Sequence, residues 1–162
     1  MSKSPDQVPQ RIAPGFVRRA AADDASAIER LYRELVSDPL IRVLPGQVAA
    51  LSDSPTSYLL VVEADGTVCA TALLNICPDA MYGTQPFGAI ENVIVAQGMR
   101  GRGIGRLLLE YVEQLAIAHD CTKLMLLSGT TREAAHTFFQ RNGFTSDAKH
   151  AFVKYRRHFT VR

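Results

Sequence analysis

One short stretch of this sequence combines positive charge with very small side chains at the predicted start of a helix. It reads RGRGIGR and follows the apolar run VIVA, which is typical of a strand. The first N–H groups of a helix have no partner within it, and the helix dipole makes that end positive. Glycines let an anion approach the backbone, and arginines add charge, so the stretch predicts a site for a pyrophosphate. The residues concerned are Arg100, Gly101, Arg102, Gly103, Ile104, Gly105 and Arg106.

Two common phosphate-binding motifs do not fit this stretch. A P-loop requires Lys followed by Ser or Thr after its last glycine, whereas Ile104 follows Gly103. A dinucleotide-binding fold requires an acidic residue after the next strand, but Ser128 and Gly129 stand there. Too little chain remains for further strand–helix–strand units, so a third kind of site is needed.

The elements that must position this turn follow one another in a mixed α/β order. A hairpin dipeptide, Asp65-Gly66, divides the apolar residues 57–76 into two strands. The run at 122–127 is apolar enough for a central strand. The other strands are expected at residues 15–20, 89–95 and 149–155, and helices at 23–36, around 48–51, at 103–118 and at 131–142. Residues 1–14 are polar and rich in proline, which predicts a mobile tail before a single domain at 15–162.

Composition narrows the classes of function. The net charge of +2 gives no indication of nucleic acid or membrane as a partner. No apolar run approaches the length of a membrane span, and the N-terminus lacks the apolar core of a secretory signal. Cys69, Cys77 and Cys121 share no metal or redox spacing, so no metal is predicted. Unpaired cysteines fit a reducing, cytoplasmic setting.

The glycine–arginine stretch also carries a resemblance. Arg100, Gly103 and Gly105 match the Arg/Gln-x-x-Gly-x-Gly/Ala signature of the GCN5-related N-acetyltransferase (GNAT) superfamily. IENVIV resembles the fourth strand of that family, and REAAHTFFQRNGF resembles its recurring helix and turn. The resemblance covers residues 16–155 and looks nearest to the small-amine acetyltransferases. It implies an α/β fold whose mixed central sheet has splayed fourth and fifth strands, flanked by about four helices.

The resemblance implies a site for acetyl-CoA, with coenzyme A lying in the opening of the sheet. The backbone of Val93, Ile94 and Val95 would pair with the pantetheine arm. The N–H groups from Gly101 to Arg106 would hold the pyrophosphate. Arg132 would either contact coenzyme A or cap its helix. Phe139 stands where the family usually carries a tyrosine that protonates the leaving thiolate. Ser128 or a water could replace that acid, and a core-packing role for Phe139 is equally consistent.

The implied reaction is direct transfer of an acetyl group to a primary amine, which requires a base. Glu91 is the candidate, because a period of two places Ala89, Glu91, Val93 and Val95 on one face of the strand; a structural salt bridge is the alternative. The acceptor, a small-molecule amine, is expected against loops 37–56 and 77–88. A protein amino group as acceptor, a homodimer, and a non-catalytic acyl-CoA sensor remain open.

Overall fold

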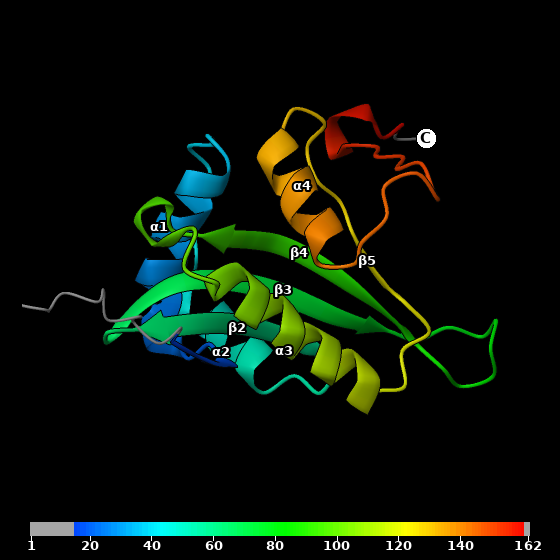
Figure 1. Ribbon diagram of the computed structural model, residues 1–162, viewed down its shortest axis with the longest axis horizontal. Helices are drawn as coiled ribbons and strands as arrows, with labels where there is room; N and C mark the ends of the chain where they lie inside the picture. The colour runs from blue at the N-terminus through cyan, green and yellow to red at the C-terminus, as the bar shows by residue number, and fades with distance from the viewer. Residues whose placement is uncertain (1–14, 161–162) are drawn as a thin grey trace, which may run out of the picture.

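A five-stranded sheet in the order β1-β2-β3-β4-β5 organises the computed structural model, which describes residues 15–160 (Figure 1). The first four strands are antiparallel to their neighbours, and β5 runs parallel to β4. The strands are β1 (Phe16–Arg19), β2 (Ser57–Ala64), β3 (Thr67–Cys77), β4 (Phe87–Val95) and β5 (Leu124–Leu126). The four α-helices are α1 (Ala25–Leu35), α2 (Pro45–Ser52), α3 (Ile104–Ala118) and α4 (Glu133–Arg141). This arrangement confirms the expected mixed α/β fold; the tail predicted at 1–14 lies outside the described residues.

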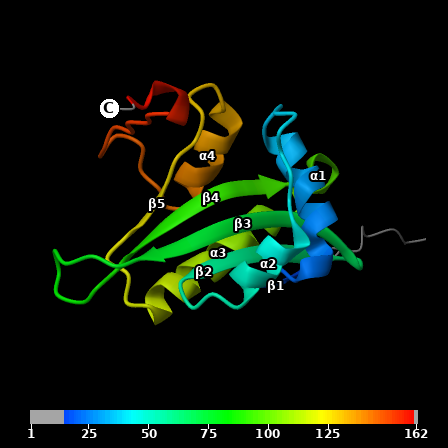
Figure 2. The same ribbon diagram turned by 180° about the vertical axis from the view of Figure 1, so that it is seen from behind.

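Each face of the sheet has its own apolar core. Helix α3 buries Ile104, Leu108 and Val112 against one face, and α4 lies beyond β4 on that same side (Figure 1). Helices α1 and α2 bury Ile28 and Val48 against the other face (Figure 2). The central strands β2 and β3 are apolar on both faces because both faces are covered. No helix among residues 15–160 is long and apolar enough to cross a membrane.

An ion-pair network ties the first strand to the start of α1. Arg18 donates to Asp24 at 2.7 Å and to Glu63 on β2 at 3.0 Å. The hydrogen bonds from Arg18 lower the pKa of Asp24, which is also an acceptor for the Ala21 N–H. Arg19 donates to the carbonyl groups of residues 51, 52 and 57. These contacts hold β1 to the start of α1, to β2 and to the end of α2.

The sheet opens between β4 and β5, as the resemblance implied. The two strands pair only from Gly88 to Ile90, and β4 then continues to Val95 paired with β3 alone. The expectation of a central strand at 122–127 was wrong: β5 has three residues and lies at the sheet edge, and Leu127 is half exposed. The apolar character of this run did not mean full burial, because Met125 is 44% and Leu127 51% exposed.

The strand expected at 149–155 is not formed. This segment is extended and exposed, with Phe152 94% accessible, and a short 3₁₀ turn at Arg156–His158 follows it. A strand requires a partner edge, and the three residues of β5 offer little pairing. Strand-forming residue types alone therefore did not produce a strand.

A bulge interrupts β4 at Asn92. Ile94 pairs with Thr71 and Glu91 with Leu73, so Asn92 and Val93 both lie opposite one residue of β3. Asn92 has a φ of +55°, a left-handed conformation that Asn tolerates better than most residues. The extra residue exchanges the two faces of the strand. The predicted alternation of Glu91 with Val93 on one face is therefore wrong.

Candidate active site

A cleft of about 1060 Å³ lies between the unpaired end of β4, the start of α3 and helix α4. Most of the residues predicted to hold a cofactor line it, although they come from three separate elements. They are Val93, Ile94, Val95, Arg100, Gly101, Gly103, Ile104, Gly105, Arg106, Arg132 and Phe139. Three predicted site residues, Glu91, Arg102 and Ser128, do not line this cleft.

The glycine turn leaves its backbone donors free. Gly101 and Gly103 have φ values of +76° and +82°, which side chains rarely adopt, and Gly103 is the N-cap of α3. A Cβ added at either glycine would meet no atom within 4 Å, so the space above both is open. Within the described range 15–160, no group accepts a hydrogen bond from the N–H groups of residues 101–106. The turn therefore offers a row of donors to an anion.

Gly105 has a different reason to be glycine. A Cβ at this buried position would lie 2.9 Å from the ring of Phe138 in α4. The missing side chain thus lets α4 approach the start of α3. The sequence suggested that all three glycines admit an anion, but Gly105 serves packing across the cleft.

The arginines of the turn point in different directions. Arg100 donates to the Val95 carbonyl at 3.0 Å and so stays at the cleft wall. Arg106 pairs with Glu110 at 2.7 Å, on an exposed part of α3. Arg102 lies toward Cys69 at the start of β3; burial raises the pKa of that thiol, and the charge of Arg102 offsets only a small part of the rise. Positive charge around the turn is therefore supplied by Arg100 and Arg106, with Arg132 and Arg141 facing them from α4.

Glu91 lies on the face of β4 that carries α1, opposite Leu73, whereas Val93 and Val95 pack toward α3. Its side chain is exposed. Within residues 15–160 it forms no ion pair, which removes the alternative of a structural salt bridge. A free carboxylate thus stands at the bulge, one residue before the left-handed Asn92.

The two residues connected with a leaving-group acid are both apart from polar partners. Phe139 is buried, lines the cleft and packs edge-on against Phe144 with ring centroids 6.0 Å apart. The Ser128 hydroxyl is buried, and no other group of the described chain bonds to it. Ser128 follows β5 rather than facing the cleft, so its position gives no support for the acid role.

Two residues of α1 that the sequence did not single out reach β4 beside the cleft. Burial raises the pKa of the Tyr32 phenol, and the side chain of Asn92, in polar contact with it, offsets part of that effect. Glu34 accepts a hydrogen bond from the backbone N–H of Gln97 at 3.0 Å. Helical spacing could have placed Tyr32 on the inner face beside Ile28. No sequence pattern indicated its partner on β4.

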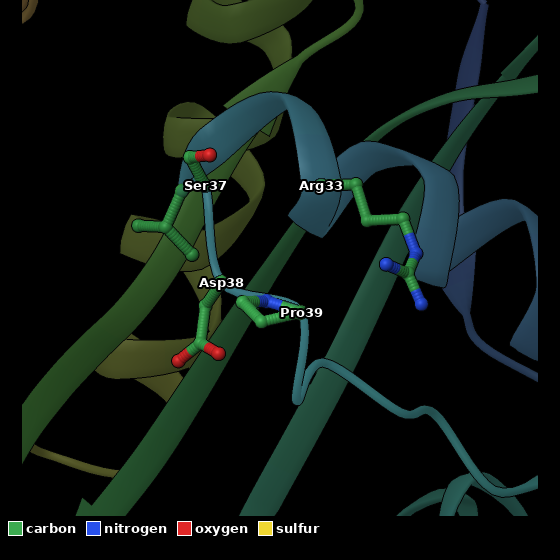
Figure 3. Close-up of a pocket in the computed structure, with 5 residues that line it drawn as sticks. Arg33, Ser37, Asp38 and Pro39 are labelled. Atoms are coloured by element: carbon green, nitrogen blue, oxygen red, sulfur yellow. The ribbon is translucent and has the colours of Figure 1, made fainter.

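The two loops expected to line the acceptor lie at opposite ends of β4. The loop at 78–86 leads into the start of β4 and projects from the sheet, whereas the segment after α1 lies near its other end (Figures 1 and 2). A hollow of about 260 Å³ occurs at that second place, with Arg33, Ser37, Asp38 and Pro39 around it (Figure 3). Of these two segments, only the one after α1, around residues 36–44, is near the bulge.

Comparison with known proteins identifies the family. Residues 28–144 match the model of the Acetyltransferase (GNAT) family, which is most of the chain. The chain belongs to the GNAT family. This GNAT protein is 29% identical over 133 residues to an aminoglycoside N(6′)-acetyltransferase type 1 from Stenotrophomonas maltophilia, covering 79% of this chain and 84% of that protein.

Solved structures agree with this assignment. A protein from Agrobacterium tumefaciens strain C58, provisionally assigned as an acetyltransferase, is 30% identical and superposes with a TM-score of 0.77 over 86% of this chain and 99% of that one. An aminoglycoside acetyltransferase from an uncultured soil metagenomic sample shares the fold at 14% identity, with a TM-score of 0.74 over 86% and 94% of the two chains. The cleft of this GNAT protein is thus a candidate acetyltransferase active site.

Proposed function

We propose that this GNAT protein transfers an acetyl group from acetyl-CoA to a primary amine of a small molecule. One observation carries the proposal: the cleft joins an unpaired strand edge, at Val93–Val95, to a turn whose N–H groups are free. Such an edge suits an amide-containing arm, and such a turn suits a pyrophosphate. These are the two hydrogen-bonding parts of coenzyme A.

The residues present fit that cofactor. The open space above Gly101 and Gly103 admits phosphate groups to the backbone, and Arg100 and Arg106 lie beside the turn. Arg132 and Arg141 supply further positive charge from α4. When bound, acetyl-CoA would supply an acetyl thioester, whose carbonyl carbon is open to attack by an amine.

Glu91 is the base in this proposal. A protonated amine has no lone pair, so a carboxylate must accept its proton before nitrogen can attack. Glu91 is exposed and free of ion pairs within the described residues, so it can accept a proton directly or through a water. The bulge at Asn92 separates Glu91 from Val93, so the base and the cofactor-pairing backbone face different sides of β4.

A small-molecule acceptor is favoured by the comparisons. The relative from Stenotrophomonas maltophilia is named as an enzyme that acetylates an aminoglycoside. The acceptor would approach Glu91 from the side of α1, where the segment after α1 is hollowed (Figure 3). We place the enzyme in the cytoplasm, because the three cysteines are all free, which is typical of proteins in a reducing setting.

A panel of amines tests the proposal. Purified protein is mixed with acetyl-CoA and, in turn, an aminoglycoside, an aminoalkylphosphonate, an amino sugar phosphate, a polyamine and a lysine peptide, and the release of free thiol is followed. We expect release above the amine-free background with at least one small amine. Release with the peptide alone would indicate a protein acceptor. Tight acetyl-CoA binding with no release from any amine would instead support a non-catalytic acyl-CoA sensor.

A further inference from the structure

Residues 92–97, which include the cleft-lining residues 93–95, have no strand partner on one edge. Neighbouring strands normally hold a strand from both edges, but β5 pairs with β4 only as far as Ile90. Beyond that point, β3 alone holds β4 through the sheet, and the bulge at Asn92 breaks this ladder as well. An unpaired edge is what a cofactor arm would require, but it leaves the segment free to move.

Helix α1 contacts the first end of this segment through Tyr32. The helix crosses the sheet beside the end of β4 (Figures 1 and 2), and Tyr32 packs with Leu73 against the core on that face. Helix α1 packs against β4 along this stretch, and the Tyr32 phenol lies close to the side chain of Asn92, whose φ of +55° defines the bulge. A left-handed residue other than glycine costs about 1–2 kcal/mol, so it persists where its surroundings hold it.

The same helix contacts the other end of the segment through Glu34. Its Oε2 accepts a hydrogen bond from the Gln97 N–H at 3.0 Å, although the two residues are 63 positions apart in the chain. Gln97 begins the 3₁₀ turn Gln97–Met99 that leads into the glycine turn. Tyr32 and Glu34 therefore reach residues 92 and 97, on either side of the cleft-lining residues 93–95.

We infer that Tyr32 and Glu34 are positioning residues, through which α1 holds both ends of the β4 segment that receives acetyl-CoA. Helix α1 takes over the support that a paired fifth strand would give, and leaves the strand edge free for the cofactor. The inference deepens the proposed function, and its role for acetyl-CoA rests on it. The rigidity of residues 92–97 in the ligand-free protein does not depend on the proposed function, so the positioning role and the proposed function can fail separately.

Hydrogen–deuterium exchange of the ligand-free protein tests the inference directly. Glu34→Ala, which removes the hydrogen bond to the Gln97 N–H, and Tyr32→Phe, which removes the hydroxyl beside Asn92, should each raise exchange in peptides covering residues 91–99 by about three- to tenfold. Peptides from β2 should be unchanged. Glu34→Gln keeps an acceptor oxygen and should restore most of the protection. The controls are Tyr111→Phe, a matched change on α3, and Ser26→Ala, an exposed position on α1.

Acetyl-CoA titration supplies the second readout. Tyr32→Phe and Glu34→Ala should raise the Kd for acetyl-CoA by about three- to tenfold, while Glu34→Gln and both controls stay near the wild type. Unchanged exchange at residues 91–99 in both variants would overturn the inference. So would equal exchange in Glu34→Gln and Glu34→Ala, because the hydrogen bond would then be irrelevant. A wild type that does not bind acetyl-CoA would contradict the proposed function, and the exchange data would still decide the positioning role.

Discussion

The two halves of this molecule differ in how completely their strands and polar groups are paired. In the N-terminal half, β1 to β3 pair along their length, both faces are covered, and Arg18 is satisfied by two carboxylates. In the C-terminal half, β4 is bulged and paired with β5 over three positions, and Ser128 and the turn at 101–106 have polar groups without partners among residues 15–160. The unpaired backbone donors of the turn at 101–106 border the cleft, whereas Ser128 does not line it.

This contrast suggests that the two halves have different roles. The N–H groups at the start of a helix form a ready site for an anion, so the unpaired donors of this turn are a reason to expect a ligand. The N-terminal half would then determine the stability of the fold, while the C-terminal half determines affinity and turnover. Variants in each half should separate the two properties, and the effects expected range from several-hundredfold to a few-fold.

The largest effect should come from Glu91→Gln. The substitution keeps the size of the side chain but removes its ability to accept a proton, so kcat should fall about 10²–10³-fold, the usual contribution of a general base. The Kd for acetyl-CoA should stay within about twofold, because Glu91 does not line the cleft. Asp53→Asn, an exposed change after α2, is the matched control. An unchanged kcat would remove Glu91 from the mechanism.

Gly103→Glu should separate affinity from stability. The new side chain would enter the open space above the turn and bring a negative charge close to the pyrophosphate, so the Kd for acetyl-CoA should rise about 10²-fold or more. Gly83→Glu adds the same side chain at another glycine with positive φ and open space, in the loop before β4 and outside the cleft, and is the control for backbone strain. Titration calorimetry measures both. Equal affinity in the two variants would place the pyrophosphate elsewhere.

Asp24→Asn should do the reverse, by changing stability and leaving affinity unchanged. It removes a nearly buried carboxylate that accepts hydrogen bonds from Arg18, and we expect a loss of about 2 kcal/mol, or roughly 4–8 °C in Tm, at neutral pH. Asp23→Asn, on an exposed neighbour, is the control.

The loss caused by Asp24→Asn should depend on pH. Arg18 lowers the pKa of Asp24 in the folded protein, so the stabilisation is complete above the unfolded value of about 4. It disappears as the pH falls through the lower, folded value. The Tm difference between wild type and variant should therefore shrink below about pH 4. A constant difference across that range would show that the charge of Asp24 is not what stabilises the fold.

The sequence predicted the parts of the fold that rest on local signals. The Asp65-Gly66 turn, the helices and the glycine–arginine motif all depend on residues close together in the chain, and all are present in the structure. The sheet opening followed from the family resemblance. The failures depended on distant partners. Residues 149–155 have strand-forming side chains but no edge to pair with, and β5 was placed at the centre because it is apolar.

The candidate site shows the same limit. Residue types indicated the cofactor cleft well, but a single extra residue at Asn92 reversed the predicted face of Glu91. A period-two pattern cannot reveal a bulge, because the pattern assumes an unbroken ladder. The contacts of Tyr32 and Glu34 with β4 join residues about 60 positions apart, and nothing in their local sequence marks them. The sequence indicated which residues belong to the site, but it did not determine which way their side chains point or which distant residues they contact.

The smallest effect should come from Phe139→Tyr, which adds a hydroxyl where the family resemblance implies an acid. Phe139 lines the cleft while its ring packs against Phe138 and Phe144. We expect kcat to rise about two- to fivefold, because a thiol of pKa near 8.5 already leaves without much help. Loss of stability should stay under about 1 kcal/mol, since a hydroxyl at the cleft edge can still meet water, whereas a fully buried one would cost about 1–3 kcal/mol. Phe16→Tyr, the same change on an exposed residue of β1 away from the cleft, is the control. Measuring kcat and Tm on one preparation separates the outcomes. A lower Tm with no gain in rate would mean that Phe139 is a packing residue. It would also mean that a hydroxyl at this position of the C-terminal half does not protonate the leaving thiolate.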